Sequence, residues 1–250
     1  MNGKKILGID IGGSGIKGAI IDIKTGQMAT ERIRIETPSP ATPQDVALVM
    51  KELVKRFGWK GICGCGFPAV VQKGVARTAA NIDKAFIGTN IDKLFSEATK
   101  CQVFAINDAD AAGMAEMKFG AGKKQNGVVI LITVGTGIGT VIFSNGKLVP
   151  NTELGHIVLK NTQEAELYAS DAVRKKDDLS WKDWGIRFNE YLRYMEDLFW
   201  PDLFIIGGGA SKKDDQFKQF LTTRTPVVMA QQKNNAGMVG AAVYARLQVK

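Results

Sequence analysis

A glycine-rich stretch between two short apolar runs constrains the fold of this chain more than any other feature. The stretch runs from Asp10 to Gly18, after the apolar run at 6–9 and before the one at 19–23. Glycine permits a tight turn, so the pattern predicts a β-hairpin. A Walker loop or a dinucleotide-binding turn would lead into a helix, whereas β-branched residues follow here and favour a strand.

The same turn offers groups that could bind a phosphate. Glycines leave main-chain N–H groups accessible and can adopt backbone angles closed to other residues, and the Ser14 hydroxyl could join them on an anion. Asp10 would lie where a carboxylate can bind a hydrated divalent cation or stabilise the turn. The candidate donor-binding residues here are Asp10, Gly12, Gly13, Ser14, Gly15 and Lys17. A glycine-rich turn often has no ligand, so both interpretations stay open.

Composition excludes several classes of protein. The chain has 250 residues, 45% of them hydrophobic and 23% charged, which is typical of one large globular domain or two small ones. Its three cysteines are too few for a disulfide framework and indicate a reducing compartment. The first predicted strand begins too early for a signal peptide, so we expect a cytoplasmic protein. Residues 127–146 carry no charge, but their glycines and β-branched residues predict two strands rather than a membrane helix.

The net charge of +8 would suit a polyanionic partner. Nucleic acid is a poor candidate, because the basic residues are spread along the chain without a basic arm or an aromatic and basic motif. We therefore expect neither a nucleic-acid partner nor a membrane. A surface that is merely basic is the remaining alternative.

Helices and strands alternate along the rest of the chain, which predicts an α/β fold with a mixed sheet. The strands predicted after the hairpin are 27–35, 62–67, 103–106, 128–134, 140–144, 203–206 and 226–229. The predicted helices are 44–57, 91–98, 109–119, 164–173, 182–199, 216–221 and 236–247. A short hairpin is expected around Gln72-Lys73-Gly74.

The opening pattern occurs a second time in the middle of the chain. Gly135-Thr136-Gly137-Ile138 matches Gly13-Ser14-Gly15-Ile16 at an offset of 122 residues, about half the chain length. Two such turns in two similar halves suggest a duplicated domain with a phosphate held between facing hairpins. A further glycine run, 207–209, predicts a close strand-to-helix turn, and Gly208 and Gly209 could also lie near a nucleotide.

Several motifs, in order along nearly the whole chain, resemble the ROK (repressor, open reading frame, kinase) family of sugar kinases. They are Asp10 to Gly18, Asn107-Asp108, Val134 to Gly139 and Glu153-Leu154-Gly155-His156. The likeness extends to family members that use polyphosphate, through Thr78 to Lys84, Asn107 to Gly113, Pro150 to Glu153 and Trp200 to Phe204. The family belongs to the superfamily of sugar kinases, heat-shock proteins and actin.

The resemblance implies two ribonuclease H-like (actin-like ATPase) domains around a central cleft. The first would span 1–107, with the last helix in 236–250 packing back on it, and the second 108–235. The implied reaction moves a terminal phosphoryl group from polyphosphate or ATP to the 6-hydroxyl of glucose with Mg²⁺ beside Asp10. We also expect a homodimer.

A sugar kinase needs a carboxylate that accepts the proton of the attacking hydroxyl, and the resemblance gives this role to Asp108. Capping of the following helix is the alternative role. The implied sugar-binding residues are Asn81, Asn107, Asp108, Glu153, His156 and Glu166. The equivalent of His156 in many family members also binds zinc with cysteines. Residues 161–165 contain no cysteine, which leaves His156 as a sugar ligand or a hydrogen-bonded core histidine.

The phosphoryl donor stays open at this point. ATP would place adenine near the glycines at 207–209, whereas polyphosphate would need cationic side chains beyond the hairpins. The candidate lysines are Lys17, Lys84, Lys118, Lys123, Lys124, Lys212 and Lys213. A strictly ATP-dependent kinase for glucose or mannose is one alternative. A sugar-sensing regulator without catalysis is another, although no helix-turn-helix precedes the first strand.

Overall fold

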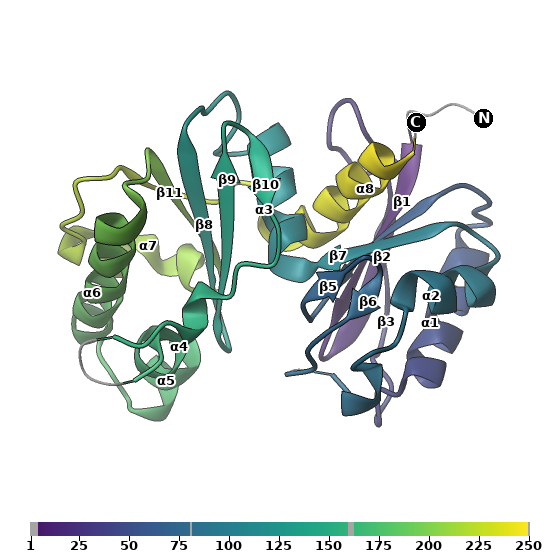
Figure 1. Ribbon diagram of the computed structural model, residues 1–250, viewed down its shortest axis with the longest axis horizontal. Helices are drawn as coiled ribbons and strands as arrows, with labels where there is room; N and C mark the ends of the chain where they lie inside the picture. Colours follow the sequence, from purple (N-terminus) through teal and green to yellow (C-terminus); the bar gives the residue numbers. More distant parts are fainter. Residues whose placement is uncertain (1–4, 81, 160–162, 250) are drawn as a thin grey trace. The chain divides into compact units, whose positions relative to one another are not determined.

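The computed structural model describes residues 5–80, 82–159 and 163–249, and the chain forms two compact units (Figure 1). Unit 1 comprises Met1–Phe119 and Asn234–Lys250, and unit 2 comprises Gly120–Lys233. The sequence predicted a boundary after residue 107. The contacts instead assign α3 (Asp108–Phe119) to unit 1, because it packs along α8 (Ala236–Gln248). Gly240 faces the carbonyl of Ala111 in this pairing, where no side chain would fit.

Unit 1 contains a five-stranded mixed sheet in the order β3-β2-β1-β4-β7. The strands are β1 (Lys5–Gly12), β2 (Gly15–Asp22), β3 (Ile33–Ile35), β4 (Cys63–Phe67) and β7 (Val103–Asn107). The first three are antiparallel, and β4 and β7 run parallel to β1. The carboxyl ends of β1, β4 and β7 therefore lie at the same edge as the first glycine-rich turn.

Helices cover both faces of this sheet. Leu7 and Ile9 pack into one core with α1 (Pro43–Arg56) and α2 (Ile91–Thr99), whereas Ile6 points to the other core with Met238 and Ala115. This alternation is the two-residue period of a strand. Figure 1 shows α8 alongside β1, on the opposite side from α1 and α2.

Two glycines let α8 approach the sheet at backbone distance. A Cβ atom at Gly8 would lie 2.0 Å from the Met238 carbonyl oxygen, and one at Gly64 would lie 1.9 Å from that of Ala241. Both glycines point to the α8 face, so the strands carry no side chain at these two points of closest approach.

Unit 2 contains a second five-stranded mixed sheet, in the order β10-β9-β8-β11-β12. Its strands are β8 (Val128–Val134), β9 (Ile138–Ser144), β10 (Lys147–Val149), β11 (Leu203–Gly208) and β12 (Val227–Met229). Strands β8, β9 and β10 are antiparallel, and β11 and β12 run parallel to β8. The two sheets therefore share one strand order and one set of directions, which confirms the predicted α/β fold with mixed sheets.

An aromatic cluster fastens the long helix of unit 2 to its sheet. Trp184 and Phe188 of α6 (Trp181–Phe199) stack with ring centroids 5.0 Å apart, and Phe217 of α7 (Asp214–Phe217) meets Trp184 edge-on. The Trp184 ring N–H donates to the Ala169 carbonyl of α4 (Ala165–Ala169). The buried ring system thus fixes α4, which carries a predicted site residue.

Several predicted elements differ from the structure for local reasons. The third strand is limited to Ile33–Ile35, because the Thr30 hydroxyl accepts the Ile20 N–H that a longer strand would bond. The helix predicted at 164–173 is two helices, α4 and α5 (Asp171–Lys176), because the Ser170 hydroxyl caps the second. The helix predicted at 216–221 is α7 followed by a 3₁₀ turn, Lys218–Phe220. Strand β10 was missed although Asn145-Gly146, both with positive φ, is a strong hairpin signal.

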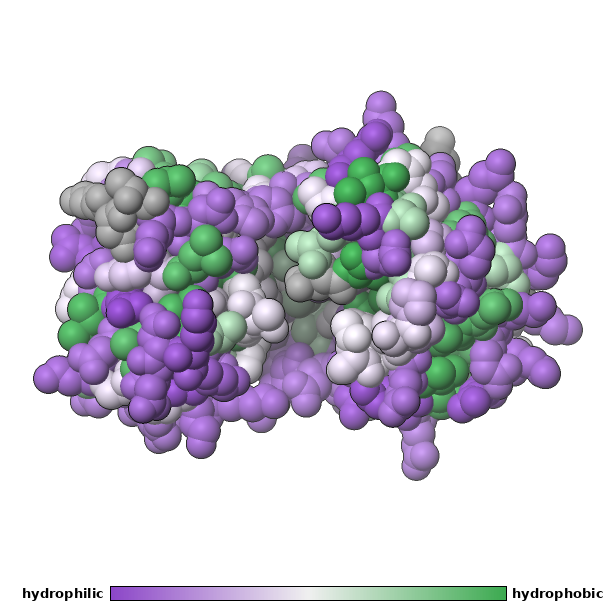
Figure 2. Space-filling model, turned by 90° about the horizontal axis from the view of Figure 1, so that it is seen from below, coloured by the Kyte–Doolittle hydropathy of each residue, from purple (hydrophilic) through white to green (hydrophobic). Residues whose placement is uncertain are grey.

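The remaining elements are short. The predicted small hairpin is formed by β5 (Val71–Gln72) and β6 (Val75–Ala76). Four short 3₁₀ helices of the described ranges are η1 (Lys84–Phe86), η2 (Leu154–His156), η3 (Ala210–Lys213) and η5 (Lys233–Asn235). Figure 2 shows hydrophilic residues over most of the visible face of each unit, with apolar residues in separate patches. None of the helices in the described ranges has both the length and the apolar composition to cross a lipid bilayer.

Candidate functional site

The first glycine-rich turn joins β1 to β2, with Gly12 opposite Gly15. Neither these glycines nor Gly13 has a positive φ, so the expectation that they supply unusual backbone angles is wrong. A Cβ atom at Gly15 would lie 2.4 Å from Nε of Arg34, so the end of the Arg34 side chain lies directly against this glycine. The Arg34 guanidinium covers the turn and donates to the Ser14 carbonyl, and the Thr37 hydroxyl donates to the Gly12 carbonyl.

Asp10 precedes this turn and pairs with a lysine on the neighbouring strand. Its carboxylate lies 3.7 Å from the Lys17 ammonium group, directly across from it in the register of β1 and β2. Burial raises the pKa of Asp10, and the positive charge of Lys17 opposes that rise. The carboxylate also reaches Gly237 in the first turn of α8, where a Cβ atom would lie 2.7 Å from its Cγ. A single carboxylate of this kind suits Mg²⁺, which keeps most of its water ligands.

Asn107 and Asp108 stand at the junction of β7 and α3. The Asn107 side-chain oxygen accepts the N–H groups of Ala109 and Asp110, and its amide nitrogen donates to the Ala69 carbonyl. Asn107 therefore caps α3, and both ends of its amide have structural bonds, which compete with its predicted role in sugar binding. Asp108 also accepts the Ala109 N–H, at 2.8 Å, but it is half-exposed. The capping alternative thus belongs chiefly to Asn107.

The second glycine-rich turn joins β8 to β9. The Gly135 N–H donates to the Gly137 carbonyl at 3.0 Å, and the Ile138 N–H donates to Oε2 of Glu166 at 3.4 Å. A Cβ atom at Gly137 would lie 2.5 Å from the same oxygen, so this glycine makes room for the Glu166 carboxylate. The two turns are thus covered by groups of opposite charge.

The third glycine run, residues 207–209, packs against the end of β8, where the second turn begins. Gly208 has a φ of +78°, and a Cβ atom there would lie 2.3 Å from the Val134 carbonyl oxygen. The Ser211 hydroxyl donates to the Gly208 carbonyl, which turns the chain from β11 into η3. The predicted strand-to-helix turn is present, and its role toward a donor stays a prediction.

The segment that carries Glu153 and His156 is tied to β9. Thr140 and Thr152 exchange two hydrogen bonds, each from a hydroxyl to the other residue's carbonyl at 2.8 Å. A Cβ atom at Gly155 would lie 2.1 Å from the Ile138 carbonyl oxygen, so η2 packs directly on the strand. These contacts bring Glu153 and His156 next to the second turn.

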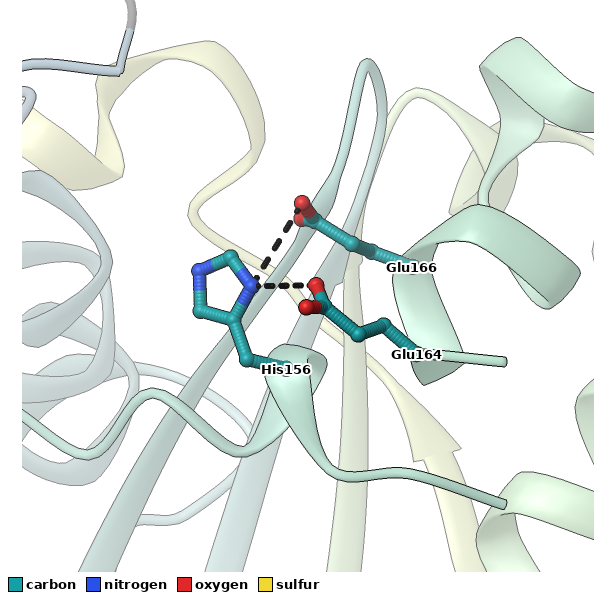
Figure 3. Close-up of side chains that lie close together, drawn as sticks. All are labelled: His156, Glu164 and Glu166. Carbon is teal, nitrogen blue, oxygen red and sulfur yellow. Dashed lines mark hydrogen bonds and ion pairs between the residues drawn. The ribbon is translucent and has the colours of Figure 1, made fainter. Parts of the chain in front are cut away.

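Three side chains of unit 2 converge at this point (Figure 3). Nδ1 of His156 lies 2.8 Å from Oε2 of Glu164 and 3.7 Å from Oε1 of Glu166. A carboxylate only accepts, so Nδ1 donates to Glu164 and Nε2 is available to accept from a hydroxyl when the ring is neutral. The ligand atoms of the three lie within 4.8 Å of one another, close enough for a divalent cation to bridge them.

Glu164 is a candidate site residue that the sequence did not predict. It stands at the N-cap of α4, where Ser, Thr, Asp or Asn would normally cap, and its side chain makes no capping bond. The carboxylate turns to His156 instead. A glutamate at a capping position was the available signal, but only the fold reveals its partner.

The carboxylates around His156 shift its titration. The hydrogen bond that Nδ1 of His156 donates to Glu164 raises the pKa of His156 above its usual range. The negative charges of Glu166 and Glu153 raise this pKa further, and partial desolvation opposes the rise. Burial raises the pKa of Glu153, which His156 opposes and Glu166 reinforces. The charged imidazolium is therefore favoured, and its contribution to stability is present at low pH and lost as pH rises through the raised pKa of His156.

Glu164→Gln is expected to lower the pKa of His156 toward its ordinary value, because a neutral amide no longer stabilises the imidazolium. His156 is the single histidine of the sequence, so one set of ring resonances in an NMR titration reports it directly. Glu190→Gln is the matched control, since Glu190 bonds to Tyr168 in the same unit. An unchanged His156 titration in Glu164→Gln would show that Glu164 does not set its charge.

The other predicted residues lie as follows. Asn81 lies outside the described residues. Lys118 lies over the Phe119 ring, and burial lowers its pKa, with Arg246 adding to the effect. Lys84 begins η1, and Lys212 and Lys213 are exposed on η3. A polyphosphate path along these lysines stays a prediction. The structure adds Arg34, which the sequence analysis did not select.

Comparisons with known proteins agree on one family. A family model described as ROK matches residues 6–170. A protein of Mycobacterium tuberculosis named polyphosphate glucokinase is 50% identical over 237 residues, covering 94% of this chain and 89% of that protein. The crystal structure of an inorganic polyphosphate/ATP-glucomannokinase from Arthrobacter sp. strain KM is 46% identical, with a TM-score of 0.91, and covers 98% of this chain and 99% of that one. A ROK family glucokinase from Streptomyces griseus, solved with glucose and AMPPNP, is 25% identical with a TM-score of 0.81 over 97% of this chain and 99% of that one.

Proposed function

The chain belongs to the ROK family, and from this premise we propose that it is a kinase that phosphorylates glucose with polyphosphate or ATP. The observation that carries the proposal is the 50% identity, over 94% of this chain, to a protein named polyphosphate glucokinase. The structural likeness to a polyphosphate/ATP-glucomannokinase supports both donors. The half-exposed Asp108 beside a helix cap made by Asn107 supplies a suitable base.

The proposed reaction begins at Asp108. Its carboxylate accepts the proton of the glucose 6-hydroxyl as that oxygen attacks the terminal phosphorus of the donor. The bond from this phosphorus to the bridging oxygen breaks, and the electron pair leaves on a polyphosphate shortened by one unit or on ADP. Mg²⁺ held near Asp10 would spread the developing negative charge.

The sugar hydroxyls would be bound by the polar groups of unit 2. Glu153 and Glu166 accept hydrogen bonds, and Nε2 of His156 accepts or donates according to its charge. Leaving one such hydroxyl unpaired in a closed site costs about 1 to 3 kcal/mol, so several fixed partners are needed for selectivity. Asn81 and Asn107 complete the proposed sugar-binding set.

We infer further that the two units arose by duplication of one ribonuclease H-like domain. The equal strand order of the two sheets and the repeated turn, at Gly13 and Gly135, support this. A homodimer and a cytoplasmic location are also part of the proposal. The three free, buried cysteines suit a reducing compartment.

A donor assay tests the function. With saturating glucose and Mg²⁺, glucose 6-phosphate should form from polyphosphate, and formation from ATP would establish a second donor. Product from ATP alone would favour the strictly ATP-dependent hexokinase, a function suggested by the relative solved with AMPPNP. The kinase proposal would be contradicted if neither polyphosphate nor ATP gave a sugar phosphate with glucose or with mannose.

A further inference from the structure

Arg34 occupies a position that neither the motif nor the reaction accounts for. It lies on the edge strand β3 of unit 1, opposite Lys17 of β2, which in turn lies opposite Asp10 of β1. Directly paired residues of neighbouring strands point to the same face of a sheet. Two cations and one carboxylate therefore form a row beside the first glycine-rich turn.

The end of the Arg34 side chain lies against the turn at Gly15. Gly15 is buried although its neighbours Gly13 and Ser14 are exposed, and a Cβ atom at Gly15 would lie 2.4 Å from Nε and 2.7 Å from Cζ of Arg34. Because Gly15 has no positive φ, its backbone does not require glycine. With no side chain at Gly15, the guanidinium lies directly against the turn.

The contacts also change the electrostatics of the turn. Carbonyl oxygens repel a bound anion, and the carbonyls of Gly12 and Ser14 accept hydrogen bonds from Thr37 and Arg34 respectively. A guanidinium has five N–H donors in a planar fork, and the bond to Ser14 uses one of them. Arg34 itself is exposed, so the rest of the fork can meet a ligand.

The second turn provides an internal comparison. The corresponding space there, beside Gly137, holds the carboxylate of Glu166, which would repel a phosphate chain rather than attract it. Of the side chains that cover the two turns, the cationic one, Arg34, thus lies at the first turn. Lys17 contributes less there, because the Asp10 carboxylate lies 3.7 Å from its ammonium group.

We propose that Arg34, supported by Lys17, binds the phosphate chain of the donor at the first turn. It holds a phosphate that is not transferred, through the bidentate geometry that guanidinium and phosphate oxygens share. The inference rests on the proposed function and names the residue that recognises the donor. An arginine that only stabilises the turn is the competing explanation.

Arg34→Ala tests the proposal, with Arg32→Ala as the matched control because Arg32 is an exposed arginine of the same segment. The KM for polyphosphate should rise about tenfold, since a charge-assisted bidentate contact is lost, while the KM for glucose stays unchanged. The slope of log KM against log salt should fall by roughly one. Arg34→Lys, which keeps the charge and loses the fork, should lie between wild type and Arg34→Ala.

Three results would overturn the inference. In one, Arg34→Ala has the donor KM and salt slope of Arg32→Ala. In another, its thermal midpoint and both KM values change together, as loss of a turn contact would cause. In the third, Arg34→Lys matches wild type.

Calorimetric titration of polyphosphate into the protein without glucose separates the proposal on Arg34 from the proposed kinase function. A wild type that binds polyphosphate through Arg34 but forms no product would refute the kinase function alone.

Discussion

Asp108→Asn is expected to lower kcat by about three orders of magnitude while leaving glucose binding nearly intact. General-base catalysis contributes typically about 10² to 10⁴-fold, and asparagine has no carboxylate to accept the proton of the 6-hydroxyl. The substitution keeps the size of the side chain, and its remaining carbonyl oxygen can still accept the Ala109 N–H. The measurement is steady-state kinetics with polyphosphate and with ATP, together with glucose binding by calorimetry.

Asp45→Asn is the control for this experiment. Asp45 stands in the first turn of α1, in the same unit, where its carboxylate accepts a hydrogen bond from the hydroxyl of Thr42, the residue that caps the helix. Its replacement should lower stability slightly and leave kcat unchanged. Near-normal turnover in Asp108→Asn would remove Asp108 from the role of base. A large loss of thermal stability in that variant would instead indicate a structural role.

The helix-capping question shows what sequence could and could not decide. Asp108 and Asn107 are both good capping residues, and their spacing before a helix does not tell which of them caps. In the structure, Asn107 accepts both first-turn N–H groups, those of Ala109 and Asp110. The motif predicted the position of the Asp108 carboxylate at the start of the helix. Only the hydrogen bonds in the structure show that Asn107 accepts the N–H groups of the first turn of α3.

The glycine-rich turns show a different limit. Their position between strands was predictable, because alternating apolar runs and glycine define a hairpin locally. The side chains that lie against Gly15 and Gly137 could not be predicted, since each comes from another part of the sequence, Arg34 in one case and Glu166 in the other. Sequence spacing carries no information about such tertiary contacts, and Arg34 and Glu164 were missed for that reason.

The positions of the strands could be predicted in part from the sequence. Long apolar runs such as Val128–Val134 were placed correctly. Short elements failed where one side chain competes with the backbone, as Thr30 does for the Ile20 N–H and Ser170 for the start of α5. Such local hydrogen bonds are worth about as much as one ladder bond, so periodicity alone cannot weigh them.

The assignment of α3 to unit 1 follows from tight packing that no helical periodicity reveals. Helix α8 returns to the first unit and lies on β1 and β4 through Gly8 and Gly64, with Gly240 facing α3. Burying backbone against backbone requires glycine at each crossing point. The carboxyl ends of β1 and β7, which carry Asp10 and lead into Asp108, are therefore held by the same helix. The stability of that packing bears directly on the proposed catalytic residues.

Gly64→Ala should test this packing with a large loss of stability. The new Cβ atom would lie 1.9 Å from the Ala241 carbonyl oxygen and 2.8 Å from the Ala242 nitrogen, so the backbone of α8 must move away from β4. Overpacking of this kind costs about 3 kcal/mol, and the thermal midpoint should fall by roughly 10 °C. Gly66→Ala, on the same strand, has its nearest atom at 3.6 Å, an ordinary contact, and should leave the midpoint nearly unchanged. Equal midpoints for the two variants would mean that α8 does not rest on the strand at Gly64. If the midpoint falls in Gly64→Ala alone, the donor KM and kcat of this variant are then measured below its thermal transition. A change in either constant would show that the position of α8 affects Asp10 and Asp108.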